Sequence, residues 1–374
     1  MKRTLLAILS VLLLLLAHGS FCQTDVRTEV RIPDISGYLT LACDFHVHTV
    51  FSDGAVWPTI RPEEAWIEGL DAIAITDHIE YLPHKDDIKT DDFNRSFELA
   101  RGSAAQHQIL LIRGGELTRD MPPGHFNAIF LKDVNALAKE DYKDALKAAV
   151  DQGAFVFWNH PGWRQPGTIP IWYPEHTELV NNGWMHGMEI ANDHDYYPKA
   201  FGWCLEKNIT MLGNSDVHSP VQMAFDPQNN EHRPLTLVFA EEKSEKAVKE
   251  ALFAGRTAVY YGEYLLGREK YLKPIFEESV QIVSSQDRQD RITMQVHNSS
   301  CVTFELRSSG KIDHVSFPEK LTLYAGKTVL SKIGIEQKQP PAKELVLPYI
   351  VKNLLVAPDK GLPVRLKVSL TPQE

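Results

Sequence analysis

The chain has 374 residues, which is enough for more than one domain, and 43% of them are hydrophobic and 24% charged. This balance is typical of an ordinary globular protein. The formal net charge is −10 and no lysine- or arginine-rich tract occurs. The charge therefore argues against a nucleic-acid-binding protein, since binding to a phosphate backbone needs clustered cations.

The first 22 residues have the features of a secretory signal peptide. Two basic residues precede an apolar run over 4–17, and small or polar residues follow before Gln23. The run is too short for a membrane-spanning helix. We expect cleavage after Cys22, a secreted or periplasmic protein, and no stable membrane span. An uncleaved anchor is the alternative. Lipid attachment to Cys22 is disfavoured because Phe21 is a poor residue before such a cysteine.

Short apolar runs then alternate with helix-like segments. The predicted strands are residues 39–43, 72–75, 109–112, 127–130, 155–158, 188–190, 210–212 and 235–240. The predicted helices are residues 62–70, 91–107, 141–153 and 243–256. Residues 163–186, rich in Trp, Pro and His, are predicted to form an ordered loop. The alternation is typical of parallel α/β units, and seven or eight strands favour a closed barrel over an open sheet.

The pattern changes after about residue 275. Alternating runs without helical partners follow, namely SVQIV, RITMQVH, VTFELR, LTLYAG, ELVLPYIV and VRLKVSL. Closely spaced turns between such runs predict a small β-sandwich. We therefore expect a signal peptide (1–22), a barrel domain (23–274) and a β-rich domain (275–374). The last has no cluster of His or acidic residues, so we expect it to have a structural or docking role.

Potential metal ligands follow nearly every strand of the barrel domain. The stretch DFHVHTVFSDG (44–54) comes after the first strand, and TDH, RGGE, NHP, MEIANDH and SDVH follow later ones. The carboxyl ends of parallel barrel strands form one face, so these side chains are expected to converge. A lone His-x-His often reflects packing, but a mouth lined with unpaired imidazoles and carboxylates would be unfavourable without cations. Mixed ligands of this kind suit two or three ions of Zn, Mn or Fe.

The order HxH…D, TDH, GxE, NHP, GxEI and SDxH resembles the PHP (polymerase and histidinol phosphatase) superfamily of metal-dependent phosphoesterases. The resemblance covers roughly residues 40–265. It implies an α/β fold, a distorted (β/α)7 barrel of PHP type, followed here by the small all-β sandwich-like domain. The overall character is most similar to secreted bacterial phosphodiesterases.

The resemblance also implies how the ligands divide among three divalent ions. The ligands of the first ion would be His46, His48, Glu116 and Asp216. Those of the second would be the bridging Glu116, His160 and a residue near the sixth strand, for which we choose His194 over Glu189. Those of the third would be Asp53, His78 and His218. Some family members carry histidine in place of Asp53, so the third site is expected to be weaker or differently occupied.

Two further residues are candidates for catalysis. Arg164 could bind a phosphate oxygen with its planar fork, or could be an ordinary exposed loop arginine. His125 could protonate a leaving group, or could be a hydrogen-bonded histidine at the rim. Asp44 and Asp77 adjoin ligand histidines, and we expect them to orient those ligands.

These features predict a secreted metal-dependent phosphoesterase acting on a small phosphorylated substrate. We expect it to cleave phosphodiester bonds with a hydroxide that bridges two metal ions. The alternatives are a phosphomonoesterase, or a hydrolase of esters, carbamates or amides that uses the same cluster. A polymerase-associated module is disfavoured by the signal peptide and the acidic charge. The organic part of the substrate and the oligomeric state stay open.

Overall fold

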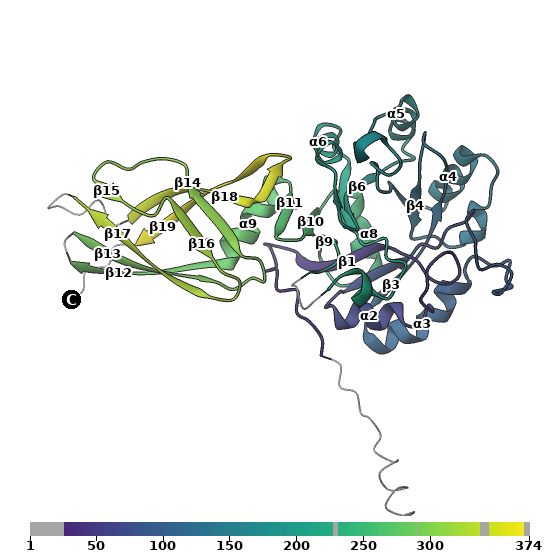
Figure 1. Ribbon diagram of the computed structural model, residues 1–374, viewed down its shortest axis with the longest axis horizontal. Helices are drawn as coiled ribbons and strands as arrows, with labels where there is room; N and C mark the ends of the chain where they lie inside the picture. The colour runs from purple at the N-terminus through teal and green to yellow at the C-terminus, as the bar shows by residue number, and fades with distance from the viewer. Residues whose placement is uncertain (1–25, 227–230, 289, 337–343, 370–374) are drawn as a thin grey trace, which may run out of the picture.

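The computed structural model describes residues 26–226, 231–288, 290–336 and 344–369 (Figure 1). The predicted signal peptide lies outside these ranges. Within them, no helix is both long enough and apolar enough to cross a membrane. The molecule is elongated, with a broad α/β domain at one end and a narrower all-β domain extending from it (Figure 1).

The α/β domain is built around a curled sheet. Its strands are β1 (Leu39–Val47), β2 (Ala72–Ile75), β3 (Leu110–Leu117), β4 (Phe126–Ile129), β5 (Phe155–Trp158), β6 (Gly187–Asn192), β7 (Asp195–Tyr196), β8 (Thr210–Asn214), β9 (Leu235–Ala240), β10 (Thr257–Tyr261) and β11 (Tyr264–Gly267). β1, β2 and β3 pair in parallel, as do β5, β6 and β8. β8 meets β9 where the Thr236 hydroxyl bonds both the N–H and the carbonyl of Gly213. The predicted barrel-like α/β fold is confirmed.

Two predicted strands run against the expected direction. β4 is antiparallel to both β3 and β5, and β9 is antiparallel to β1. The regular parallel alternation expected from the sequence is therefore broken at these two places. Because β4 is reversed, its first residues, and not its last, lie at the carboxyl ends of β3 and β5.

Helices surround the sheet. They are α2 (Arg61–Ile67), α3 (Arg95–His107), α4 (Tyr142–Asp151), α5 (Pro174–Asn181), α6 (Pro198–Glu206), α7 (Val221–Ala224) and α8 (Glu245–Phe253), with short turns η1 (Val134–Leu137) and η2 (Pro166–Thr168). Helix α5 corrects the prediction of a loop over 163–186. It begins with Pro174 in its first turn, where a missing N–H costs nothing. The His176 ring caps it by accepting from the Tyr173 N–H.

The remainder is an all-β domain entered through helix α9 (Glu269–Ser279). Its strands are β12 (Val280–Arg288), β13 (Arg291–Asn298), β14 (Phe304–Ser308), β15 (Val315–Ser316), β16 (Lys320–Leu323), β17 (Thr328–Ile335), β18 (Glu344–Ala357) and β19 (Lys360–Ser369). One sheet has the order β12-β13-β17-β15, and the other pairs β16, β14, β18 and β19. Alternate residues such as Met294 and Leu347 bury between the sheets. The predicted β-sandwich is confirmed.

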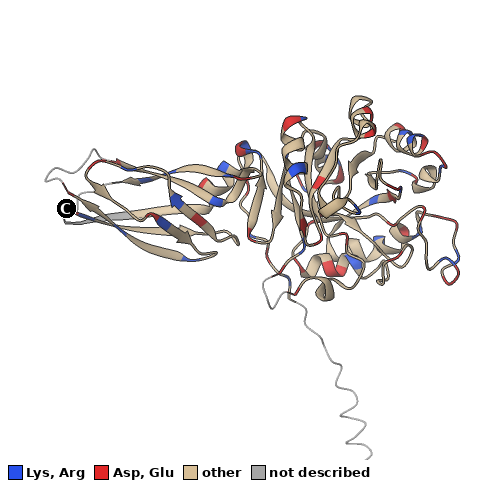
Figure 2. Ribbon diagram, turned by 45° about the horizontal axis from the view of Figure 1, so that its top comes forward, with Lys and Arg blue, Asp and Glu red and all other residues tan. Residues whose placement is uncertain are grey.

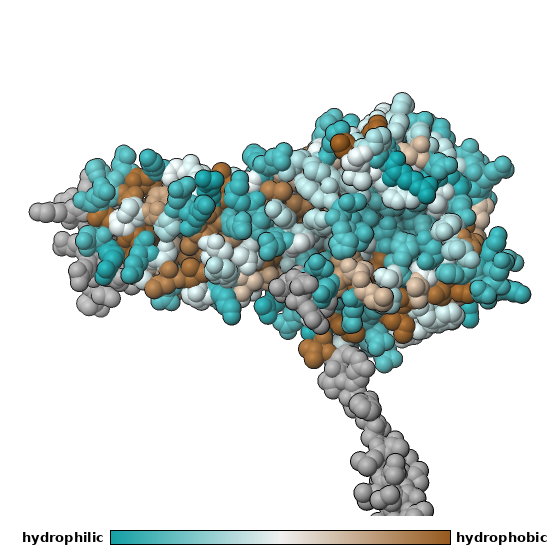
Figure 3. Space-filling view, viewed as in Figure 1, coloured by the Kyte–Doolittle hydropathy of each residue, from teal (hydrophilic) through white to brown (hydrophobic). Residues whose placement is uncertain are grey.

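The two domains share a strand. The final part of β18 lies parallel to β11, with Leu265 opposite Leu354 and Leu266 opposite Leu355. The boundary predicted at 274/275 falls inside α9, and independent folding of the two parts stays a prediction. Acidic and basic residues are interspersed over both domains (Figure 2). Figure 3 shows a largely hydrophilic surface, with brown apolar patches on the narrow domain and along the lower edge of the broad domain.

Candidate metal centre

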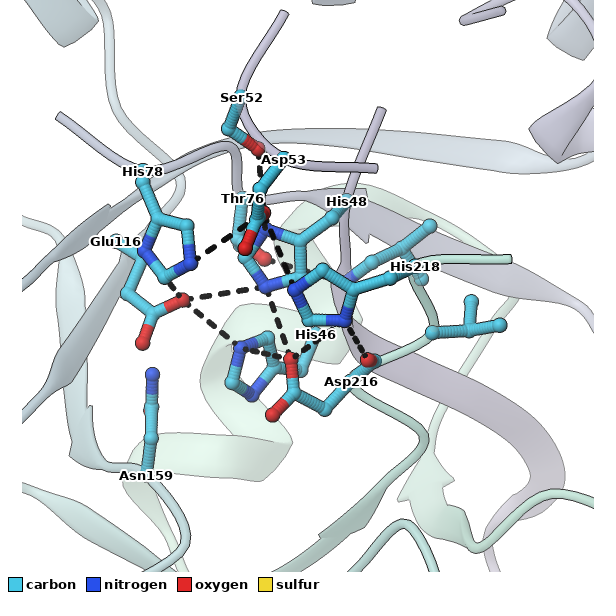
Figure 4. Close-up of polar contacts among 12 residues, drawn as sticks. His46, His48, Ser52, Asp53, Thr76, His78, Glu116, Asn159, Asp216 and His218 are labelled. Carbon is cyan, nitrogen blue, oxygen red and sulfur yellow. Dashed lines mark hydrogen bonds and ion pairs between the residues drawn. The ribbon is translucent and has the colours of Figure 1, made fainter. Parts of the chain in front are cut away.

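The carboxyl ends of β1, β2, β3, β5 and β8 converge on a buried cluster of imidazoles and carboxylates (Figure 4). His46 lies in β1 and Glu116 in β3, whereas His78, His160 and Asp216 follow β2, β5 and β8. Asp216 and His160 have positive φ angles of 53° and 26°. Such angles are strained for non-glycine residues, and strained backbone of this kind is common at functional sites.

Four ligand atoms surround a first point in this cluster. His46 Nε2 lies 3.1 Å from both Glu116 Oε2 and Asp216 Oδ1. His48 Nε2 lies 3.2 and 3.0 Å from the same two oxygens. His48 Nε2 is buried and has no hydrogen-bond partner within the described ranges. A cation between these atoms would satisfy that nitrogen and both carboxylates, so the residues present fit the first predicted ion.

A second group surrounds the other oxygens of the two carboxylates. Glu116 Oε1 is 2.8 Å from His125 Nδ1 and 3.6 Å from His160 Nε2. The same His160 nitrogen is 3.7 Å from Asp216 Oδ2. Glu116 therefore faces both groups, one oxygen to each, as the prediction of a bridging ligand requires.

A third group lies nearest to solvent. Asp53 Oδ1 is 3.1 Å from His218 Nε2 and 3.5 Å from His78 Nε2. This oxygen, too, is buried without a hydrogen-bond partner among the residues described. The Nδ1 atom of His218 lies 2.7 Å from the Asp216 carbonyl, so it carries the proton and leaves Nε2 free to bind a cation.

Two of the candidate residues near the second group lie differently from one another. The structure does not bring His194 to the cluster, because β6 turns into the short hairpin with β7 before this residue. Its side chain is 61% exposed and lies 3.6 Å from Asp193. His125, predicted to protonate a leaving group or to be a hydrogen-bonded histidine at the rim, is hydrogen-bonded to Glu116 and lies beside His160, close enough to be a ligand itself. The reversed direction of β4 explains this position, since His125 immediately precedes that strand.

Glu189, the alternative to His194, supports the ligands without joining them. Its Oε1 accepts from His46 Nδ1 at 2.9 Å and from Asn214 Nδ2 at 2.9 Å. Its Oε2 accepts from the His160 N–H at 2.7 Å and from Asn192 Nδ2 at 2.8 Å. The His46 Nδ1–H bond selects the tautomer whose Nε2 is free for a cation.

The two predicted orienting aspartates act through backbone N–H groups and hydroxyls. Asp44 accepts from the backbone N–H groups of His46 and Ser215. Asp77 accepts from the N–H and hydroxyl of Thr49 and from the Ser52 hydroxyl. Both carboxylates therefore hold the ligand-bearing loops. These contacts agree with the orienting role expected from the sequence.

The cluster is arranged so that its carboxylates stay ionised. Burial alone would raise the pKa of Glu116, but the charges of His78 and His46 hold it well below its usual value. The pKa of Asp216 is likewise depressed, against burial, chiefly by His46 and His48. Glu116 and Asp53 outweigh burial and raise the pKa of His78 to about 9. Two ionised carboxylates among several imidazoles are a donor set suited to divalent transition metals.

Comparison with solved structures identifies the family. A two-domain protein from Bacteroides vulgatus, containing a predicted PHP-like metal-dependent phosphoesterase, matches 92% of this chain over 100% of its own, with 47% identity and a TM-score of 0.88. This chain belongs to the PHP-like metal-dependent phosphoesterases. It is accordingly a metal-dependent hydrolase. A family model for an Ig-like domain matches residues 278–367.

More distant structures resemble only part of this PHP-like hydrolase. A candidate metal-dependent phosphoesterase from Bifidobacterium adolescentis matches 48% of this chain and 88% of its own, with 16% identity and a TM-score of 0.38. An amidohydrolase from Chromobacterium violaceum covers the same shares, with 15% identity and a TM-score of 0.36. No curated protein matches the chain.

The mouth of the PHP-like centre opens over the third group. The His218 side chain is 38% exposed, against 9% or less for His160 and the histidines of the first group. Trp163 borders the second group, with its ring 4.7 Å from that of His125. The Arg164 guanidinium lies 4.2 Å from the centre of the Trp163 ring and is in no ion pair within the described ranges. The candidate phosphate-binding arginine is therefore exposed, beside the tryptophan that borders the second group.

Proposed function

We propose that this hydrolase is a secreted phosphodiesterase whose centre holds three divalent ions of Zn, Mn or Fe. The observation that carries the proposal is the pair Glu116 and Asp216, each of which directs one oxygen to the first group and the other to the second. Two carboxylates shared in this way would hold two ions side by side. The third group, around Asp53, would hold another ion at the entrance.

When bound, such ions supply an ionised water near neutral pH and polarise the phosphoryl group. The chain's own residues have other tasks. Glu189 keeps Nε2 of His46 unprotonated, and the burial of the first group excludes bulk water. Arg164 would bind a non-bridging phosphoryl oxygen, and Trp163 supports the guanidinium from below. His125 would serve as a ligand of the second ion, in place of the role of acid suggested by the sequence.

The surroundings of the centre favour a phosphodiester. A phosphodiester is an anion with two organic groups, so the Arg164 guanidinium would bind one of its non-bridging oxygens. A carboxyl ester is neutral and gains little from an unpaired arginine. The aromatic surface of Trp163 would pack against the organic part of the substrate.

The test uses the full-length enzyme, stripped with a chelator and reloaded with Mn²⁺ or Zn²⁺. We expect metal-dependent hydrolysis of bis(p-nitrophenyl) phosphate, with slower turnover of p-nitrophenyl phosphate and p-nitrophenyl acetate. His46→Ala and Asp216→Ala should abolish turnover because each removes a ligand of the first ion. Full activity in the stripped enzyme, or a preference for the acetate ester, would refute the proposal.

The location follows from residues 1–22, whose apolar run is bounded as in cleaved export signals. We expect the mature protein to begin at Gln23 and to be found outside the cytoplasm. N-terminal sequencing of protein recovered from the periplasm or medium tests this. An intact Met1 on the exported protein would contradict cleavage.

A further inference from the structure

Arg61, the first residue of α2, is buried beneath the metal centre, with 1% of its surface exposed. Its Nε donates to the His48 carbonyl at 2.8 Å. Nη2 donates to the carbonyls of Val217 and His218, each at 3.0 Å. Nη1 donates to the Ser219 carbonyl at 3.0 Å and to Glu64 at 2.8 Å. Five bonds match the five N–H donors of a guanidinium.

These carbonyls belong to two ligand-bearing segments that are far apart in the sequence. His48 ends the first segment, and the other three follow Asp216 in the loop after β8. The same loop is tied to residues 49–55, because the Ala55 N–H donates to the His218 carbonyl at 2.8 Å. That stretch carries Asp53. Arg61 therefore ties the backbone of His48, directly after which the stretch carrying Asp53 begins, to the loop that carries His218.

The charge of Arg61 does not explain its presence. Burying a guanidinium is unfavourable, and a cation so close to metal ions would repel them. Glu64 compensates the charge through Oε2 and also accepts from the Val221 N–H through Oε1. Arg61 therefore contributes by fixing the positions of the carbonyls, since a planar guanidinium binds several carbonyls at fixed angles.

We propose that Arg61 is a positioning residue for the third metal ion, holding the His218 loop against the loop that carries Asp53. This inference rests on the proposed three-ion centre. The first and second groups have further supports besides Arg61, namely Glu189 and the strands β1 and β3, each of which pairs with β2. Loss of the arginine fork should therefore weaken one ion selectively.

The experiment is a Zn²⁺ titration of full-length, metal-stripped protein by calorimetry, with metal content measured by elemental analysis. Wild type should bind three ions per chain. His218→Ala removes a ligand of the third ion and so identifies its binding phase. Arg61→Lys replaces the five-donor guanidinium by a single ammonium. In this variant the Zn²⁺ affinity of the same phase should fall at least ~10-fold. The other two phases should keep their wild-type affinities.

Arg268→Lys is the matched control. Arg268 also binds backbone carbonyls, those of Cys204 and Ile209, but at the opposite end of the barrel. It should leave all three phases unchanged. If Arg61→Lys does not fold, Glu64→Gln tests the same contacts, because one of its two N–H partners would then face an amide NH₂. In that variant the Zn²⁺ affinity of the same phase should fall about 3-fold or more.

Three results would overturn the inference. The first is unchanged binding of all three ions in Arg61→Lys or, if that variant does not fold, in Glu64→Gln. The second is an equal loss at every phase together with a lower melting temperature of the metal-free protein, which would indicate general structural damage. The third is fewer than three ions in wild type, which would refute the three-ion centre itself and is recognised before any variant is measured.

Discussion

Replacing Glu189 by glutamine should weaken both metal binding and the fold, although the side chain keeps its size. The carboxylate accepts four hydrogen bonds, and an amide can accept at only one of its two ends. If the amide oxygen faces His46, the NH₂ group meets the His160 N–H and the Asn192 amide, which are both donors. If the amide is reversed, its NH₂ donates to His46 Nδ1. The His46 proton then moves to Nε2 and blocks the first ion.

The magnitude follows from these two orientations. The first leaves up to two buried donors unpaired, at about 1–3 kcal/mol each. Asn192 can rotate its amide, so one unpaired N–H is the lower bound. A loss of 1 kcal/mol lowers the melting temperature by roughly 1–2 °C in a chain of this length, because the entropy of unfolding grows with the number of residues. In the second orientation a proton on His46 Nε2 competes with the metal ion. Loss of such an orienting contact lowers metal affinity by ~10–100-fold.

The assay is thermal unfolding of the metal-free full-length protein, followed by Zn²⁺ titration. Glu178→Gln is the control, because Glu178 pairs with Lys143 at the surface and its side chain is 46% exposed. It should change stability by no more than about 0.5 kcal/mol. Wild-type melting and wild-type Zn²⁺ affinity in Glu189→Gln would refute the proposed selection of the His46 tautomer.

Three other predictions follow from the same geometry. Glu116→Gln should cost at least one ion per chain and lower turnover more than ~100-fold, because an amide nitrogen cannot ligate a cation; a full metal content by elemental analysis would contradict the bridge. His194→Ala should leave metal content and turnover unchanged, and a loss of either would restore it as a ligand. His176 donates to the Pro123 carbonyl and accepts from the Tyr173 N–H, and burial lowers its pKa to about 4. Below pH ~6.5 the unfolded chain takes up a proton at His176 that the folded protein does not. The free energy of unfolding is therefore highest above that pH and is about 2 kcal/mol lower at pH 5. In His176→Phe, urea unfolding with chelator present should no longer show this pH-dependent difference in the free energy of unfolding. An unchanged pH dependence would show that His176 is not its source.

Sequence reasoning located most of the centre because its ligands follow short apolar strands. His46, His48, Glu116 and Asp216 could be assigned to one mouth from the position of each strand end, and the structure brings them together. The motif order then indicated how the ligands would divide.

Strand direction was the main property that the sequence did not reveal. The run NAIF has the same apolar character whether its strand is parallel or antiparallel. In the reversed β4 the mouth lies at the start of the strand, which places His125 among the ligands. The local pattern also could not show that the chain turns back after Asn192 and takes His194 to the surface. Glu189 points inward from β6, and single-strand patterns of fully buried strands do not distinguish the two faces.

The strand shared by the two domains gives the molecule a mechanical property. β18 pairs with β19 inside the sandwich and then with β11 beside the barrel, so a hinge between the domains would have to break its hydrogen-bond ladder. The long narrow domain is therefore attached rigidly to the α/β domain (Figure 1). Whatever holds its far end also sets the direction in which the catalytic mouth faces.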